Sequence, residues 1–251
     1  MLTAITRAVS PAISECELTF LDRSAIDYGR AAAQHRAYEE CLRELGLHVI
    51  SLPALPDLPD SVFVEDPAVV LDEIAVIARP GAASRQPEAD RIAEALKPFR
   101  PLARIEAPGT LEGGDVILAG KDLYVGLSQR TNESGIAQLA AIVEPHGYSV
   151  KAVEVRGCLH LKSGACYLGH GAILANREWV DAAAFTGYRI IDVAEDWAAD
   201  VLAIGDVILM PAGFPKTAAR LESGGFTVRM IDVSELQKAE AGVTCMSLIV
   251  Q

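Results

Sequence analysis

An internal repeat constrains the fold of this 251-residue chain more than any other feature of its sequence. Three segments place two short apolar runs on either side of a polar or glycine-containing turn, a pattern that predicts a β-hairpin: "DPAVVLDEIAVIA", "DVILAGKDLYVG" and "GACYLGHGAILA". They begin at Asp66, Asp115 and Gly164, so each start follows the previous one by 49 residues (115 − 66 and 164 − 115). A similar segment begins at Asp200, and "AGVTCMSLIV" predicts one more strand near the end of the chain. A fixed period of this length indicates repeated supersecondary units.

Helical patterns alternate with these hairpins. They are "YGRAAAQHRAYEECLRELG", "PEADRIAEALKPF", "NESGIAQLAAIVEPHG" and "PKTAARLESGG", each closed by glycine or proline. We expect about five α/β units of mixed strands and a helix, closed around an axis so that one end of each unit faces a shared centre. No low-complexity linker or charge run divides the chain, which predicts a single domain over 1–251.

Composition narrows the class of protein. The net charge of −12 disfavours binding to nucleic acid or an anionic membrane and permits a cationic substrate. Apolar runs are broken well short of the roughly 18 residues that a membrane span needs, and the N-terminus lacks the apolar core of a signal peptide. The five cysteines have no metal-type spacing. We therefore expect a reduced, cytoplasmic chain.

Polar residues gather where the predicted repeats begin. The first repeat is headed by Asp60, Glu65 and Asp66, and the second by Glu112 and Asp115. The third is headed by His160, Lys162 and Ser163, and Cys245 heads the last strand. If the units surround an axis, these positions converge. A thiol, an imidazole and several carboxylates then form a candidate nucleophile, acid/base and cation-binding set.

Each of these residues also has an ordinary structural interpretation. Cys245 lies in an apolar strand, where a free cysteine is commonly a packing residue. His160 is compatible with a satisfied core histidine, and Glu112 with a turn cap. Arg85 and Arg130 are compatible with surface charges, the default for arginine. The glycines of "TLEGGDV" match no phosphate-binding loop, so nucleotide binding is rejected.

Five motifs together favour the catalytic interpretation. In order, "FVEDPAVV", "LEGGDVI", "GLSQRTN", "HLKSG" and "TCMSL" resemble the dimethylarginine dimethylaminohydrolases, and the resemblance runs from "ECELTFLDR" to the C-terminus. That family belongs to the guanidine-modifying superfamily with the pentein fold, a five-bladed α/β propeller of ββαβ-like units around a central active site. The resemblance implies a hydrolase, a dimethylargininase, that converts asymmetric dimethylarginine and monomethylarginine to citrulline and dimethylamine or methylamine.

The resemblance also implies roles for individual residues. Cys245 would be the nucleophile, His160 the general acid/base and Glu112 its acidic partner, acting through a covalent thiouronium without metal or organic cofactor. The substrate would be held at its guanidinium by Glu65 and Asp66, at its carboxylate by Arg85 and Arg130, and at its amino group by Asp60 and backbone carbonyls near Leu18 and Ala239. Apart from the resemblance, the methyl groups of such a substrate need an apolar wall, which we expect Phe63 and Leu161 to form.

One departure bears on the substrate. Deiminases that act on unsubstituted arginine resemble "HLKSG" but carry an aspartate two residues after the histidine, where this chain has Lys162. An unsubstituted guanidinium would leave N–H donors unpaired there, which favours a methylated one.

Two other functions remain as alternatives. The first is another guanidine-modifying enzyme, but arginine deiminases carry an additional helical domain, and agmatine has no carboxylate for Arg85 and Arg130 to bind. The second is a non-catalytic pentein, like the ribosome anti-association factor, which has no need of a thiol and an imidazole at matching repeat ends. The expected partner is a small cationic amino acid, with no nucleic acid and no membrane, and a homodimer is left open.

Overall fold

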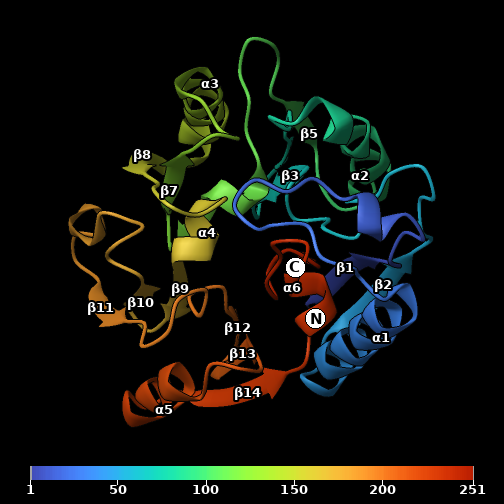
Figure 1. Ribbon diagram of the computed structural model, residues 1–251. Helices are drawn as coiled ribbons and strands as arrows, with labels where there is room; N and C mark the ends of the chain where they lie inside the picture. Colours follow the sequence, from blue (N-terminus) through green and yellow to red (C-terminus); the bar gives the residue numbers. More distant parts are fainter. Residues whose placement is uncertain (1, 251) are drawn as a thin grey trace.

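The computed structural model describes residues 2–250, whose strands form five three-stranded sheets arranged in a ring (Figure 1). In every sheet the first two strands of the unit pair antiparallel, and the second and third pair parallel. A parallel pair needs a crossover, and in four units an α-helix on the outside of the ring supplies it (Figure 1). The predicted ring of five ββαβ-like units is confirmed.

Four units are continuous in sequence. The first contains β3 (Ala68–Val70), β4 (Ala75–Ile77), α2 (Glu88–Leu96) and β5 (Leu102–Arg104). The second contains β6 (Val116–Ala119), β7 (Asp122–Leu127), α3 (Glu133–Val143) and β8 (Ser149–Glu154). The third contains β9 (Ala165–Gly169), β10 (Ala172–Ala175) and β11 (Arg189–Asp192). The fourth contains β12 (Leu202–Ile204), β13 (Val207–Pro211), α5 (Pro215–Ser223) and β14 (Thr227–Ile231).

The fifth unit joins the two ends of the chain. β15 (Leu248–Val250) pairs antiparallel with β1 (Thr3–Arg7), and β1 pairs parallel with β2 (His48–Leu52) after the crossover helix α1 (Tyr28–Glu44). The first and last strands of the described residues therefore lie in one sheet. This pairing closes the ring and fixes Cys245, three residues before β15, relative to the N-terminal segment.

Local chemistry accounts for the ends of the helices. The Asp27 side chain accepts a hydrogen bond from the N–H of Arg30 (2.9 Å) and so caps α1, and Asn132 caps α3 in the same way. The third unit differs from the others, because only a short 3₁₀ turn, Ala182–Ala184, precedes β11.

The remaining short elements lie in the connections. They are α4 (Leu161–Gly164), α6 (Ser234–Gln237) and the 3₁₀ turns Ile13–Glu15, Ala83–Arg85, Gly113–Asp115 and Glu144–His146. Within residues 2–250, every helix is too short or too polar to cross a bilayer.

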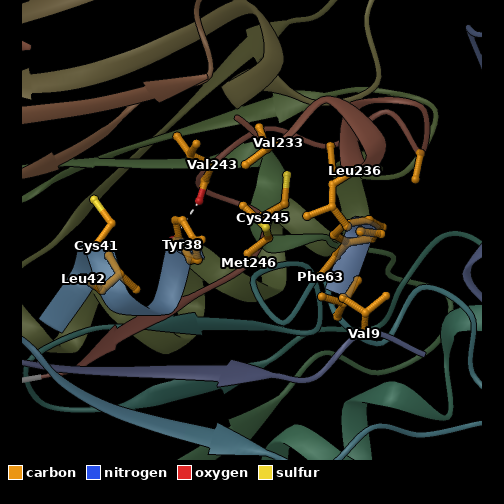
Figure 2. Close-up of a cluster of buried hydrophobic side chains, with 14 of the residues drawn as sticks. Val9, Tyr38, Cys41, Leu42, Phe63, Val233, Leu236, Val243, Cys245 and Met246 are labelled. Atoms are coloured by element: carbon orange, nitrogen blue, oxygen red, sulfur yellow. Dashed lines mark hydrogen bonds between the residues drawn. The ribbon is translucent and has the colours of Figure 1, made fainter. Parts of the chain in front are cut away.

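The apolar core is divided into five clusters, each between two neighbouring units. Between the fourth and fifth units, for example, Leu209 packs in one cluster with Tyr38 and Leu42 of α1, and each fully buried leucine contributes about 1.5–3 kcal/mol. Figure 2 shows this cluster, with the Tyr38 hydroxyl donating to the carbonyl of Val243 (2.9 Å) and with Cys245 as a member. The core thus holds the cysteine-bearing loop at the centre of the ring.

Candidate active site

The loops that precede the first strand of each unit meet at the centre of the ring. In unit order, these loops bring in Asp66, Glu112, His160, Asp200 and Cys245, each at most 8% exposed. The convergence follows from the repeat, as expected. Asp200 is the one member of this set that is not among the residues predicted from the sequence. Its position at the start of the fourth repeat is the signal that points to it.

His160 and Glu112 form the closest pair in the site. His160 Nε2 lies 2.6 Å from Glu112 Oε2, and His160 Nδ1 lies 3.8 Å from Asp66 Oδ1. Burial disfavours a charge on the imidazole, but Asp66 and Glu112 outweigh burial and raise the pKa of His160 to about 9. Burial likewise opposes the charge on Glu112, yet the contact with His160 lowers the pKa of that carboxyl to about 2. At neutral pH this is an imidazolium–carboxylate pair.

Cys245 is held against its own loop. The thiol accepts a hydrogen bond from the N–H of Gly242 (3.5 Å) and donates to Asp200 Oδ2 (3.8 Å). Burial, followed by the charges of Asp200, Glu65 and Asp66, raises the pKa of Cys245 well above its ordinary value. The resting cysteine is therefore a protonated thiol, and a cation must arrive before the thiolate becomes favourable.

Both predicted arginines are buried, so neither is a surface charge. Arg85 is held between two carboxylates, because it donates to Asp66 Oδ2 (2.7 Å) and to Glu88 Oε2 (2.8 Å). Arg130 Nη2 donates to Thr19 Oγ1 (3.0 Å), whereas its Nη1 has no hydrogen-bond partner within residues 2–250 and lies 3.6 Å from Glu112 Oε1. Arg130 thus has a donor to spare for a ligand.

A cavity of about 20 Å³ lies among these side chains, with room for roughly one water molecule. Beside Cys245 and His160, its lining includes the predicted residues Asp60, Phe63, Asp66, Arg85, Arg130 and Ala239. It also includes four that we had not predicted: Glu17, Leu159, Glu240 and Ala241.

Hydrogen bonds to Glu240 and Asp60 hold the segment from Glu17 to Leu21 beside this cavity. The Glu240 carboxylate accepts hydrogen bonds from the N–H groups of Thr19, Phe20 and Leu21, at 3.0, 2.5 and 2.6 Å. Asp60 accepts from the N–H of Glu17 (3.1 Å). An arginine-sized ligand needs far more space than the cavity offers, so the cavity has to widen before such a ligand enters.

The structure places three of the predicted residues outside the lining of this cavity. Glu65 does not line the cavity: it accepts from Lys162 Nζ (2.5 Å) and Thr244 Oγ1 (2.8 Å), and Glu65, Lys162 and Thr244 border a separate cavity of about 340 Å³. Leu161 is fully buried in the core between the second and third units, and Leu159 lines the cavity instead. Leu18 packs beside the core cluster of Figure 2 rather than lining the cavity.

Among the described residues, one group has donor atoms close enough to share a metal ion: Asp66, Glu112 and His160, within 4.8 Å of one another. His160 Nε2 already contacts Glu112 in this group, and the raised pKa of the imidazole favours a proton over a cation. The arrangement suits acid/base chemistry.

Comparison with known proteins places this geometry in a family. A family model described as N,N dimethylarginine dimethylhydrolase, eukaryotic, matches residues 18–199. The N(G),N(G)-dimethylarginine dimethylaminohydrolase of Pseudomonas aeruginosa is 42% identical over 226 residues, which cover 88% of this chain and 89% of that protein.

Two solved structures are similar along nearly the whole chain. A mutant of the Pseudomonas aeruginosa enzyme complexed with citrulline has a TM-score of 0.95 and 38% identity, covering 99% of both chains. A dimethylarginine dimethylaminohydrolase adduct with S-methyl-L-thiocitrulline has a TM-score of 0.94 and 38% identity, covering 99% of this chain and 100% of that one. The convergent loops, the thiol and the histidine–glutamate pair are thus the centre of a chain that belongs to the dimethylarginine dimethylaminohydrolase family.

Proposed function

We propose that this chain hydrolyses Nω-methylated arginines, namely asymmetric dimethylarginine and monomethylarginine, to citrulline and dimethylamine or methylamine. One observation carries the proposal: Cys245, Asp66 and His160, which is paired with Glu112, line a single buried cavity in a member of this family. The citrulline complex and the S-methyl-L-thiocitrulline adduct of the solved relatives support the same chemistry.

The substrate is held at both of its ends. Asp66, which lines the cavity 3.8 Å from His160, anchors the guanidinium. Arg130 binds the carboxylate through its spare donor, with Arg85 beside it. The amino group is met by Asp60 and by backbone carbonyls near Leu18 and Ala239. Glu65 lies outside the cavity and acts indirectly, because its contact with Thr244 supports the loop that carries Cys245.

The first half of the reaction breaks the C–N bond. The bound guanidinium lowers the pKa of the nearby thiol, and the Cys245 thiolate attacks the guanidinium carbon to give a tetrahedral adduct. An amine departs only when it is protonated, and His160 supplies that proton because Glu112 and Asp66 keep the imidazole charged. Loss of dimethylamine or methylamine leaves a thiouronium on Cys245.

The second half hydrolyses the thiouronium. His160, neutral after giving up its proton, takes a proton from water as the water attacks the same carbon. The C–S bond then breaks and the remaining hydroxyl proton passes to solvent, so that neutral citrulline is released and the Cys245 thiolate is regenerated. Each proton that leaves His160 returns to it within one turnover.

The decisive experiment is incubation of the purified chain with asymmetric dimethylarginine, followed by assays of citrulline and of dimethylamine. Equal amounts of both products support the proposal. Citrulline formed together with ammonia from plain arginine, and none from the methylated substrate, would instead identify a deiminase.

We also propose that the chain works in a reducing compartment, the cytoplasm. All five cysteines are free and buried, and the proposed mechanism needs an unoxidised thiol. Loss of activity under mild oxidation and its recovery with a reductant would support this location.

A further inference from the structure

Asp200 lies against the cysteine-bearing loop and has no part in the scheme above. It is 6% exposed, and its Oδ1 accepts the N–H of Thr244 (3.0 Å). Its Oδ2 lies 3.3 Å from Thr244 Oγ1 and 3.8 Å from Cys245 Sγ. A Cβ at Gly242 would stand 2.0 Å from the Asp200 carboxyl carbon, so only glycine permits this approach. The carboxyl group is therefore built into the loop that presents the nucleophile.

A count of protons indicates which form of Asp200 fits this position. Thr244 Oγ1 has a single proton and lies 2.8 Å from Glu65 Oε2, closer than to Asp200 Oδ2. Glu65 is the better acceptor by geometry, and Lys162 Nζ at 2.5 Å favours its charged form against the burial that raises the pKa of Glu65. Asp200 Oδ2 then faces a lone pair of the hydroxyl oxygen, a contact that is favourable only when Oδ2 carries its own proton.

The surroundings of Asp200 agree with that count. The titratable groups that face it are Glu65, Lys162 on α4, Cys166 on β9, Cys245, Tyr38 on α1 and, across a cavity of about 280 Å³, Glu240. Burial, followed by the charge of Glu65, raises the pKa of Asp200 to about 7, against the opposing N–H of Thr244 and the charge of Lys162. A substantial share of Asp200 is thus neutral at pH 7, and nearly all of it at pH 5.

We propose that Asp200 is a catalytic residue that, as a neutral acid, donates a hydrogen bond from Oδ2 to the thiolate of Cys245. When the thiol loses its proton to solvent as the substrate docks, Sγ changes from a donor to an acceptor. The Oδ2 proton then turns from Thr244 Oγ1 toward Sγ, and no bond other than the S–H bond breaks. This inference rests on the proposed function, whose nucleophile it serves.

The alternative ionised form would act against catalysis. An Asp200 carboxylate would place a negative charge 3.8 Å from the sulfur and hold the thiol in its protonated state. The activity of the wild type should therefore be limited on the alkaline side by the ionisation of Asp200.

Three variants separate these possibilities. Asp200→Asn keeps a donor near Sγ but cannot ionise, and Asp200→Leu keeps the volume without a donor. Asp206→Asn removes the same charge from an exposed turn, where the side chain is 88% exposed, and serves as the matched control. Two quantities are measured against pH: kcat/KM for asymmetric dimethylarginine, and the rate at which iodoacetamide alkylates Cys245, identified by peptide mass.

Asp200→Asn is expected to match the wild type near pH 6 and to exceed it in both quantities above pH 7, by a factor that grows about tenfold per pH unit until the thiol itself ionises. Asp200→Leu is expected to lose about 10- to 150-fold at all pH values, the usual worth of a hydrogen bond to a charged group. Asp206→Asn should follow the wild-type profile.

The proposal is overturned if Asp200→Asn reacts more slowly than the wild type at every pH, since an ionised carboxylate would then be required. It is equally overturned if the alkaline limbs of Asp200→Asn and the wild type coincide. Because Asp200→Leu could fold poorly, the Asp200→Asn comparison decides alone. Alkylation needs no substrate, so failure to turn over dimethylarginine would refute the proposed function without touching this result.

Discussion

His160 Nε2 and Glu112 Oε2 are 2.6 Å apart in the interior of the protein, with side chains 4% and 0% exposed. The pair orients the imidazole so that Nδ1 faces Asp66 and the cavity. It also keeps a proton on the ring that burial alone would remove. In the proposed mechanism, the acid that protonates the leaving amine is thus in place before substrate arrives.

Glu112→Gln should lower the pKa of His160 from about 9 toward or below its ordinary value. The amide keeps the volume and one hydrogen-bonding oxygen but removes the negative charge that offsets burial. Titration of the His160 ring by NMR measures this directly. A pKa that stays near 9 in the variant would mean that Asp66 and Asp115 hold the proton without Glu112.

The same pair predicts how stability depends on pH. Because the pKa of His160 rises on folding from 6.5 to about 9, the pair contributes fully below pH 6.5, by about 3 kcal/mol, and its contribution is lost as pH rises through 9. Urea unfolding between pH 6 and pH 9.5 should show this loss in the wild type. The loss should be much smaller in Glu112→Gln.

The sequence predicted the ring and most of the residues at its centre, because the internal repeat determines both. Units that begin at Asp66 and Asp115 face the axis with the same end, so residues that head the other units, such as His160, must meet them. Side-chain direction could not be predicted in this way. Lys162 stands two residues from His160, yet it turns toward Glu65 because a buried carboxylate requires a partner.

Asp200 was not predicted as a site residue for a related reason. An aspartate at the start of a strand is ordinarily a turn residue, and the contact with Sγ and the close approach of Gly242 show that this one lies against Cys245. The third unit has no α-helix between its second and third strands, in contrast to its neighbours. The sequence predicts no helix there either.

The two arginines should respond differently to removal. Arg130→Ala should raise KM by about 10- to 150-fold, equivalent to about 1.5–3 kcal/mol, because a donor for the substrate carboxylate is lost. Arg85→Ala should in addition lower the free energy of unfolding by about 3–5 kcal/mol, because Asp66 and Glu88 are left as unpaired buried charges. Steady-state kinetics and urea unfolding of both variants test the contrast. Equal stability of the two variants would contradict it.

Cys245→Ser should abolish turnover and leave the fold intact. The hydroxyl is nearly isosteric with the thiol but far less nucleophilic, and Gly242 can still donate to it. Citrulline formation measures the loss, and circular dichroism and thermal unfolding check the fold. Retention of more than a few per cent of wild-type activity would remove Cys245 from its proposed role.

Methylated arginine should be preferred over plain arginine by at least about tenfold in kcat/KM, which corresponds to about 1.4 kcal/mol. Lys162 donates to Glu65 and to the carbonyl of Gly113, so Asp66 is left as the guanidinium anchor in the proposed arrangement. Unsubstituted arginine would bury N–H donors without acceptors, at about 1–3 kcal/mol. Methyl groups need none, and their burial against Phe63 adds roughly 1–2 kcal/mol.

Kinetics on arginine, monomethylarginine and asymmetric dimethylarginine, measured side by side, test this preference. Lys162→Met is the informative companion variant: it strips a buried carboxylate, Glu65, of its cation and should destabilise the fold by about 3–5 kcal/mol. Because Lys162 points away from the cavity, the variant should leave the preference between substrates unchanged. Faster turnover of plain arginine by the wild type would show that a second acceptor grips the guanidinium, and would assign the chain to deiminase chemistry.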